Sequence, residues 1–298
     1  MRESRATGTT CLQDRPLRSL LFCPGDSARK MQKALAAGAD AVILDLEDAV
    51  APAAKDEARG LVRALLGGSR AGAVLVRINA ADTAAYLDDL AAVVPAAPDA
   101  IMLAKCTGPA DLLRLSQQLD ALEVAVGLAR GAIGILPLVT ESAASLRGMD
   151  YAGVTPRLVA LGFAGEDLAS DLGVAARAGG TLNPLLTEAR RAVAIAAAAA
   201  GVRAIDTPFP DPRDRERLAA ETRTAVALGY GGKLCIHPGQ IDEAHAAFRP
   251  ETGQVEWGRA VIAALDGEGG VAVVDGRMVD RAHLRLARRY VQLAEAIR

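Results

Sequence analysis

Eight short apolar runs alternate with longer segments rich in Ala, Leu and Arg, and this alternation constrains the fold more than any other feature of the chain. Each run has four to seven residues and is mostly apolar, which is typical of a strand covered on both faces. Runs of this kind alternating with helical segments predict a parallel α/β protein. The runs are Ser19–Cys23, Ala41–Leu44, Val74–Ile78, Ala100–Leu103, Ile133–Val139, Leu158–Phe163, Val202–Ile205 and Lys233–Ile236.

Helical segments are expected between the runs. They are Ala28–Ala37, Lys55–Leu66, Thr83–Val93, Ala110–Leu122, Glu141–Ala152, Thr181–Ala200 and Arg213–Leu228. Eight strands in regular alternation with helices favour a closed (β/α)₈ TIM barrel, which typically takes ~250 residues. The alternative is an open doubly wound sheet, but no G-x-G-x-x-G follows any of the runs, so a dinucleotide-binding fold has no anchor.

The pattern changes after the eighth run. Further helices are expected there, with a small hairpin that turns at Asp275-Gly276. The expected elements are Pro238–Phe248, Val255–Leu265, a break at 267–270, the strands Val271–Val274 and Arg277–Val279, and a last helix Arg281–Ile297. We therefore expect a barrel over residues 12–248 and a C-terminal extension over 249–298 that folds as a lid over an active site.

Composition and charge exclude several classes of function. The 34 Lys and Arg residues against 36 Asp and Glu give a net charge of −2, and aromatic residues make up only 3%, so nucleic-acid binding is not expected. The longest apolar tract, Ala192–Val202, is too short to cross a bilayer, and no membrane role is expected. The four cysteines are far apart and favour neither a zinc site nor a disulfide framework, which fits a cytoplasmic protein.

Polar residues stand at or just after the end of nearly every expected strand. In an α/β barrel, catalytic groups project from the C-terminal ends of the strands, so these residues are candidates for a common site. They are Asp45, Glu47, Asp48, Arg77, Asn79, Lys105, Glu141, Glu166, Asp167, Asp206 and His237.

The acidic candidates suit a hard cation. Glu141 and Asp167 follow adjacent strands with no His or Cys cluster nearby, and Mg²⁺ is held by one or two carboxylates, water and substrate oxygens. Glu141 has an alternative role at the start of the following helix, where negative charge is favoured. Asp45 and Glu47 point to one face of their strand, either in the site or in a helix cap or ion pair.

Each of the basic candidates has two possible roles. Arg77 ends an apolar strand, where its guanidinium suits a substrate carboxylate or an acid such as Glu47. Lys105 suits either a Schiff base or a salt bridge, and His237 either a general base or a hydrogen bond that stabilises its loop. Ser142 lacks a G-x-S-x-G context, which excludes a serine hydrolase of that type.

Seven segments together resemble the HpcH/HpaI aldolase/citrate lyase family, in its CitE-like branch. They occur in the family's order over nearly the whole expected barrel. They are Arg18–Asp26 (RSLLFCPGD), Gly38–Val50 (GADAVILDLEDAV), Val76–Asn79 (VRIN), Leu138–Ala143 (LVTESA), Leu161–Gly173 (LGFAGEDLASDLG), Ala204–Asp211 (AIDTPFPD) and Gly232–Gln240 (GKLCIHPGQ).

The resemblance implies a phosphoenolpyruvate/pyruvate-type TIM barrel, usually a homotrimer. Such an enzyme cleaves or forms the C–C bond between a 2-oxoacid (glyoxylate, pyruvate or oxaloacetate) and an acyl-CoA. The positions matching Glu141 and Asp167 bind Mg²⁺ in the family, the position matching Arg77 binds the oxoacid carboxylate, and Glu47 lies in the surrounding shell.

The resemblance also implies how the rest of the substrate is met. Lys55 and Arg59 would approach the CoA phosphates. The segment Asp275–Asp280 (DGRMVD) resembles the lid motif of free-standing malyl-CoA and citramalyl-CoA lyases, in which the aspartate matching Asp280 enters the active site of the adjacent subunit as acid or base.

Two departures bear on the substrate. Ala164-Gly165 reverses the family's more usual Gly-Ala, and Leu103-Ala-Lys105 replaces Leu-Pro-Lys. Three alternatives to the lyase stay open: a malyl-CoA-type thioesterase, a CoA-free aldolase of hydroxy-oxoacids, and a non-catalytic subunit that needs an acyl-carrier partner. The lid-like tail favours an enzyme over the last of these.

Overall fold

The computed structural model describes residues 12–70, 72–266 and 270–297. Backbone contacts divide the chain between Ala247 and Phe248 into two compact units, which we call the barrel unit and the C-terminal unit.

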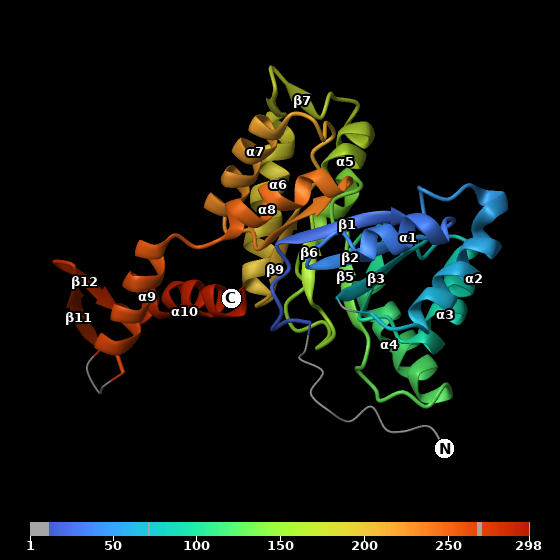
Figure 1. Cartoon of the computed structure of the whole chain (residues 1–298), viewed down its shortest axis with the longest axis horizontal. Coiled ribbons are helices and arrows are strands. Elements are labelled where there is room, and N and C mark those ends of the chain that lie inside the picture. The colour runs from blue at the N-terminus through green and yellow to red at the C-terminus, as the bar shows by residue number, and fades with distance from the viewer. Residues whose placement is uncertain (1–11, 71, 267–269, 298) are drawn as a thin grey trace. The chain divides into compact units, whose positions relative to one another are not determined.

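The barrel unit is built on eight parallel strands, in the order β5-β4-β3-β2-β1-β10-β9-β6. Isolated parallel bridges from Ile135 to Leu158 and from Leu138 to Gly162 join β5 to β6 and close the sheet, so the expected (β/α)₈ barrel is confirmed (Figure 1). The strands are β1 Ser19–Pro24, β2 Ala41–Asp45, β3 Ala73–Ile78, β4 Ala100–Leu103, β5 Gly134–Pro137, β6 Ala160–Gly162, β9 Arg203–Asp206 and β10 Gly232–Cys235.

The core of the barrel follows from the alternation of side chains along each strand. Leu20, Ile43, Leu75 and Met102 come from four neighbouring strands and belong to one buried apolar cluster. A side chain at Gly232 would lie 1.7 Å from the Leu17 carbonyl oxygen, so that close approach requires glycine. The interior is therefore packed, as in other TIM barrels.

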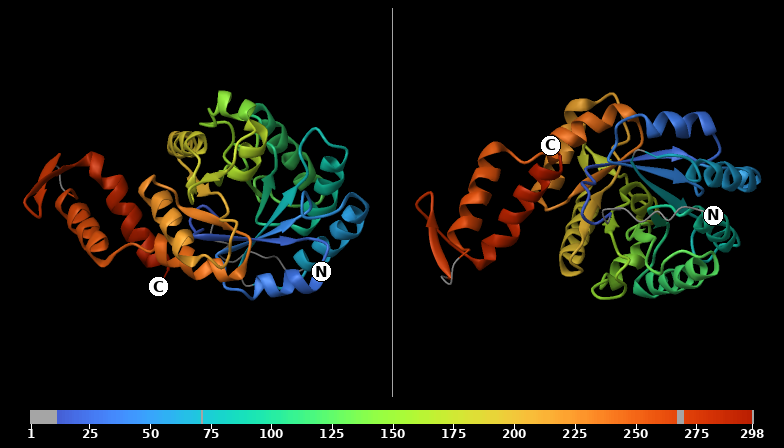
Figure 2. Two further views of the ribbon diagram at one scale, coloured as in Figure 1. Left: turned by 90° about the horizontal axis from the view of Figure 1, so that it is seen from above. Right: turned by 60° about the horizontal axis from the view of Figure 1, so that its bottom comes forward.

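Helices lie around the outside of the sheet, as Figure 2 shows from two further sides. In α2, for example, Ala58, Val62 and Leu66 are buried at a spacing of four residues and form one apolar face. The helices are α1 Ala28–Leu35, α2 Lys55–Leu66, α3 Ala85–Val93, α4 Pro109–Ala125, α5 Gly165–Leu172, α6 Pro184–Ala199, α7 Arg215–Ala227 and α8 Ile241–Phe248, with 3₁₀ turns at Pro52–Ala54, Val94–Ala96 and Pro238–Gln240.

Three segments differ from the sequence prediction. The helix expected over 141–152 is wrong: a 3₁₀ helix covers only Ala143–Gly148, begun by the Ser142 side chain, which accepts from Ser145 N. Helix α5 was not expected. The long helix expected from Thr181 begins at Pro184 instead, because Asn183 caps it, and the residues before it form a two-stranded hairpin, β7 Arg177–Ala178 and β8 Thr181–Leu182.

The C-terminal unit contains α9 Thr252–Ala264, β11 Val271–Val274, β12 Arg277–Asp280 and α10 Arg281–Ala296. The predicted hairpin is confirmed, and its turn places Asp275 and Gly276 at φ 50° and 73°, as a two-residue turn of this kind requires. Helix α9 approaches α10 closely at Gly258, where a side chain would meet the Ala287 carbonyl oxygen at 2.9 Å. The break expected at 267–270 falls largely outside the described residues.

Two expectations from composition can be set against the structure. Among the described residues, no helix is long and apolar enough to span a bilayer. Cys23, Cys106 and Cys235 are free and buried, whereas Cys11 lies outside the described residues.

Candidate active site

A forked ion pair forms where β2 and β3 end. The register of the two strands places Asp45 beside Arg77. The guanidinium donates from Nε to Asp45 Oδ1 at 2.8 Å and from Nη2 to Oδ2 at 2.6 Å. It also lies over the Phe22 ring, 4.9 Å from the centroid. Asp45 therefore fixes the orientation of Arg77 at the mouth of the barrel. Of the roles predicted for Asp45, the ion pair is observed.

Glu47 lies between two cations. Its Oε2 is 3.0 Å from Arg77 Nη1, and its Oε1 accepts from Lys105 Nζ at 2.6 Å. Lys105 Nζ is also 3.6 Å from Asp48 Oδ1. Burial raises the pKa of Glu47 although Arg77 and Lys105 oppose it. The hydrogen bond to Glu47 raises the pKa of Lys105, so the salt-bridge reading of Lys105 is the one observed.

The backbone of Lys105 is unusual. Its φ of 51° lies in the left-handed region, which costs of order 1–3 kcal/mol for a residue with a side chain and tends to occur at functional sites. In this conformation its N–H donates to Glu141 Oε2. The next N–H, that of Cys106, donates to the Leu138 carbonyl at 3.2 Å. The loop after β4 is thus tied to the loop after β5, which carries Glu141.

Glu141 and Asp167 form the acidic end of the site. Glu141 is 6% exposed, and its Oε1 is buried with no hydrogen-bond partner among the described residues. Burial raises the pKa of Glu141 to about 8, and the charges of Asp167 and Glu47 add to the effect. Burial and the charge of Asp48 raise the pKa of Asp167 as well. These acids are close enough to repel one another.

Lys55 and Arg59 both have partners within the chain. Lys55 Nζ donates to the Leu46 and Glu47 carbonyls at 2.8 and 3.0 Å, and to Asn79 Oδ1 at 2.8 Å. Arg59 donates from Nε to Asp89 Oδ1 at 2.8 Å and also pairs with Asp56. Their predicted contact with CoA phosphates stays a prediction, and it would require these partners to be shared or exchanged.

The charges of the site do not balance. We call its five carboxylates the acidic cluster: Asp45, Glu47, Asp48, Glu141 and Asp167. Three cations contact them or the backbone between them, namely Arg77, Lys105 and Lys55. With all five carboxylates ionised the surplus is two negative charges, and this surplus, the oxygen-only donors and the unpartnered Glu141 Oε1 together fit a divalent hard cation.

The metal ion would have few protein ligands. Within the described ranges, no group of three or more His, Cys, Asp and Glu side chains is placed to hold an ion. Glu141 and Asp167 form a pair, and one or two carboxylates completed by water and substrate oxygens are what Mg²⁺ ordinarily takes.

Helix α5 carries Asp167 in its first turn, and polar contacts hold the start of that helix. Gly165 N donates to Thr207 Oγ1 at 2.9 Å, and Ala164 N donates to Thr140 Oγ1 at 2.8 Å. A side chain at Gly165 would lie 3.1 Å from Thr207 Oγ1, so the Ala164-Gly165 order leaves glycine where space is short.

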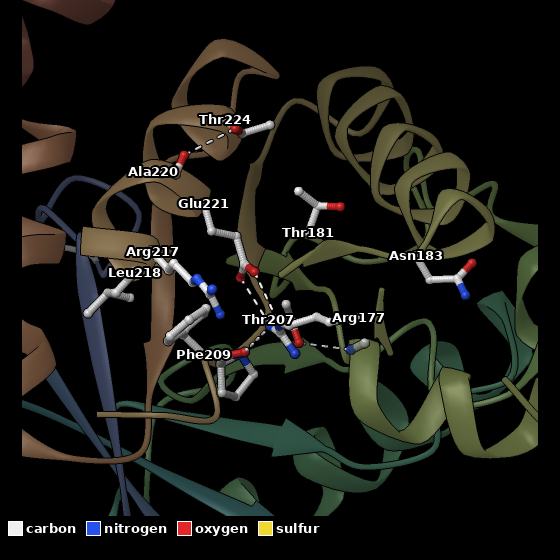
Figure 3. A network of polar contacts seen from close by, with 12 residues as sticks. Arg177, Thr181, Asn183, Thr207, Phe209, Arg217, Leu218, Ala220, Glu221 and Thr224 are labelled. Carbon is white, nitrogen blue, oxygen red and sulfur yellow. Dashed lines mark hydrogen bonds and ion pairs between the residues drawn. The ribbon is translucent and has the colours of Figure 1, made fainter. Parts of the chain in front are cut away.

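Arg177 of β7 connects α5 to the far wall of the barrel. It pairs with Glu166 of α5, and its Nε donates to Glu221 Oε2 of α7 at 3.1 Å. Its guanidinium lies over the Phe209 ring, 5.2 Å from the centroid. Figure 3 shows Arg177, Glu221, Thr207 and Phe209 gathered at this point.

Behind this point lies a second set of charges, which we call the buried ion network: Asp206, Glu221, Lys233, Arg190 and Arg177. Lys233 Nζ donates to Asp206 Oδ2 at 2.6 Å and to Glu221 Oε1 at 3.1 Å, and Arg190 grips Asp206 with two hydrogen bonds. Burial opposes ionisation of Asp206, yet Lys233 and Arg190 outweigh it and lower its pKa. Asp206 ends β9, as the strand-end pattern predicted, but it is 0% exposed and its carboxylate is paired with Lys233 and Arg190.

Two remaining candidates, Asp280 and His237, have local hydrogen-bond partners. Asp280 belongs to the C-terminal unit, where it caps α10 by accepting from Ala282 N at 2.9 Å. The neighbouring His283, 2.9 Å away, lowers the pKa of Asp280, so its side chain is a carboxylate at neutral pH. His237 Nδ1 accepts from Gly239 N at 3.0 Å and so stabilises its own loop.

Several of these contacts could not be predicted from the sequence. The pairing of Lys233 with Asp206 and that of Arg177 with Glu221 of α7 join residues 27 and 44 positions apart. The left-handed backbone of Lys105 depends on a local φ.

The chain is similar to known proteins over most of its length. A model of the family "HpcH/HpaI aldolase/citrate lyase" matches residues 18–238. A (3S)-malyl-CoA thioesterase of Cereibacter sphaeroides is 35% identical over 96% of this chain and 97% of its own length. A citrate lyase subunit beta of Escherichia coli is 33% identical, covering 92% of this chain and 93% of that protein.

A solved structure is similar over nearly the whole chain. It is CitE from Mycobacterium tuberculosis in complex with magnesium, acetoacetate and coenzyme A. The TM-score is 0.74 at 33% identity, and the match covers 94% of this chain and 98% of that one.

Proposed function

Because the chain belongs to the HpcH/HpaI aldolase/citrate lyase family, a family of carbon–carbon lyases, we propose that it is a Mg²⁺-dependent acyl-CoA lyase. It would cleave or form the bond between a 2-oxoacid and an acyl-CoA. The observation that carries the proposal is the acidic cluster, with its surplus of negative charge and the unpartnered Glu141 Oε1.

Glu141 and Asp167 would hold the Mg²⁺ ion. When bound, the ion would act as a Lewis acid on the oxygens of the oxoacid moiety. The raised pKa of Glu141 reflects burial and the neighbouring acids, and a cation at this place would relieve both costs. A solved relative, CitE from Mycobacterium tuberculosis, is in complex with magnesium, acetoacetate and coenzyme A, which supports this assignment.

Arg77 would orient the oxoacid carboxylate. Its contacts with Asp45 and Glu47 engage three of the five N–H donors of a guanidinium, which leaves donors for a ligand. Because Asp45 and the Phe22 ring already fix the group, little conformational entropy is lost when it binds a carboxylate. Glu47 would set the position of Arg77 and Lys105 behind the substrate.

Asp280 would transfer the proton at the α-carbon of the acyl-CoA. In the cleavage direction a base takes the hydroxyl proton, the C–C bond breaks, and its electron pair forms the acyl-CoA enolate. The carboxyl group of Asp280 then gives that enolate a proton at the α-carbon. In the synthetic direction the Asp280 carboxylate would remove that proton. Such an acid or base contributes about 10²–10⁴-fold.

The assembly and the CoA contacts complete the proposal. We infer a homotrimer in which the C-terminal unit of one subunit, with Asp280, completes the site of another. Lys55 and Arg59 are the candidates for the CoA phosphates. A cytoplasmic location fits the scattered cysteines.

Thioester hydrolysis is the second candidate, because a (3S)-malyl-CoA thioesterase is 35% identical over 96% of the chain. The same cation and Arg77 would serve it, with water attacking the thioester carbonyl. The two functions differ in their products.

Product analysis distinguishes them. The purified chain is incubated with Mg²⁺ and, separately, malyl-CoA, β-methylmalyl-CoA or citramalyl-CoA, and the products are identified by mass. A lyase yields an acyl-CoA with glyoxylate or pyruvate, and EDTA abolishes the reaction. Free hydroxydiacid with CoA would assign a thioesterase. No product from any of the three would overturn both. Asp280→Asn, which keeps the size of the side chain, should abolish lyase turnover and leave Mg²⁺ binding intact.

A further inference from the structure

Lys105 contacts three carboxylates of the acidic cluster, more than any other cation of the site. Its main-chain N–H donates to Glu141 Oε2. Its ammonium lies 2.6 Å from Glu47 Oε1 and 3.6 Å from Asp48 Oδ1. The proposed reaction assigns no step to this residue, so its place in the centre of the cluster requires another explanation.

The cluster offers a cation more oxygens than it needs. Mg²⁺ usually takes one or two carboxylates, and Asp45 is already engaged by the fork of Arg77. Glu141 Oε1 is a buried oxygen with no hydrogen-bond partner in the described part of the chain, and the buried Glu47 Oε2 has only its ion pair with Arg77 Nη1 at 3.0 Å. Carboxylate chemistry alone does not decide between these two oxygens.

We propose that Lys105 is the positioning residue that decides which carboxylates bind the divalent cation. Its ammonium pairs with Glu47 and Asp48 and so keeps these two carboxylates from binding the ion. Its backbone N–H donates to one oxygen of Glu141, which leaves the other oxygen for the ion. This inference rests on the cation site of the proposed function, and it adds a means of selection that the family match does not state.

The geometry on both sides of Lys105 supports this role. An ammonium hydrogen-bonded to Glu47 repels a divalent ion on that side of the cluster, which leaves the side of Glu141 and Asp167. The left-handed backbone persists although it is unfavourable, because contacts at the N–H and at the side chain hold it. The side chain is 50% exposed, so packing alone does not keep it against Glu47.

The test measures Mn²⁺ binding, because Mn²⁺ replaces Mg²⁺ at oxygen sites and is visible by EPR. Lys105→Met and Lys105→Gly both remove the ammonium, and glycine also suits the left-handed backbone, which guards against a variant that fails to fold. Lys105→Arg keeps the charge. Lys33→Met, on the exposed face of α1, changes the net charge equally and serves as the matched control.

We expect both neutral variants to bind Mn²⁺ about tenfold more tightly, since a positive charge beside the ion is gone. We also expect fewer water molecules on the bound Mn²⁺, by water-proton relaxation, because Glu47 or Asp48 replaces one. Turnover should fall about 10–100-fold, as for other residues that orient metal ligands. Lys105→Arg should resemble the native protein in affinity and bound water, and Lys33→Met should do so in all three.

Three results would overturn the inference. Unchanged or weaker Mn²⁺ binding in both neutral variants would show that Lys105 does not keep the ion from Glu47. Tighter binding with an unchanged number of waters would show that it repels the ion without selecting ligands. If the native chain itself binds no Mn²⁺, the cation site of the proposed function fails, and the inference fails with it.

Discussion

The acidic cluster and the buried ion network both lie where barrel strands end, yet they differ in how their charges are matched. In the network, two cations contact Asp206 and two contact Glu221, and Asp206 is 0% exposed with a lowered pKa. In the cluster, the carboxylates exceed the cations by two, and burial raises the pKa of Glu141 to about 8.

This difference distinguishes charged groups that stabilise the fold from charged groups that can bind a cation. A buried carboxylate that keeps a low pKa has its partners within the chain. A buried carboxylate with a raised pKa and an unpartnered oxygen is costly to ionise, and a bound cation would lower that free-energy cost. Proximity to the barrel mouth alone does not make the distinction, since Asp206 and Glu141 both follow strands.

The largest expected effect comes from removing a charge in the acidic cluster. Glu141→Gln should lower turnover of a CoA thioester at least about 10³-fold, because several kcal/mol of metal-assisted stabilisation are lost. The thermal midpoint in EDTA should not fall, since the amide has the same shape and no buried charge. A variant that keeps native turnover would remove Glu141 from the cation site.

The opposite outcome is expected in the buried ion network. Lys233→Met leaves Asp206 and Glu221 each short of a cation in a buried place, which should cost about 3–5 kcal/mol of the free energy of unfolding. Urea denaturation measures the loss, with the exposed Lys33→Met as the control. Native stability in Lys233→Met would contradict the reading of the network as structural.

The two regions should also respond differently to pH. The folded pKa of Glu141, about 8, lies above its ordinary value of 4.5, so between these values the native chain holds a proton that the unfolded chain has lost. This contribution to stability is complete below pH 4.5 and is lost as the pH rises to about 8, by up to about 1.4 kcal/mol per pH unit.

Glu141→Gln lacks this contribution. In EDTA, the free energy of unfolding of the variant minus that of the native chain should therefore increase from pH 5 to about pH 8 and level off above it. Urea denaturation at a series of pH values measures the difference. A difference that does not change with pH would mean that Glu141 is ionised across the whole range.

The smallest effect is expected at the residue that joins the two regions. Arg177→Met removes the contacts to Glu166 and Glu221 and should cost about 1 kcal/mol of stability. Because α5 also carries Asp167, turnover should fall about tenfold with weaker Mg²⁺ binding. Arg217→Met, which breaks only an exposed pair with Asp214, is the matched control. Equal kinetics in both variants would show that Arg177 does not position Asp167.

The sequence predicted the barrel because its strands are short, apolar and regularly spaced, and all eight are found. It did not predict α5, since Gly165-Glu-Asp167 opens like a loop and the helix has only eight residues. The helix expected over 141–152 failed because Ser142 caps a short 3₁₀ turn that Gly148 ends. Local propensity decided these segments less than their neighbours did.

The site was predicted in part. The strand-end rule brought Glu47, Arg77 and Glu141 to one place, and the family resemblance, which the family match confirms, named their roles. Two of the side-chain partners, Asn79 for Lys55 and Asp89 for Arg59, lie 24 and 30 positions away in the chain, and no spacing rule reveals them. The sequence does not show that Asp206 is paired and that Glu141 has an unpartnered oxygen, because this depends on which charged groups lie beside each residue in the fold.

A crystal soaked in Mn²⁺ tests the distinction between the two regions most directly. Anomalous scattering locates the ion without reference to activity. We expect one strong peak in the barrel unit, coordinated by Glu141 Oε1 and Asp167, and none at Asp206 or Glu221. A peak in the buried ion network, or none beside Glu141 at a concentration that supports turnover, would contradict the assignment of the acidic cluster as the cation site.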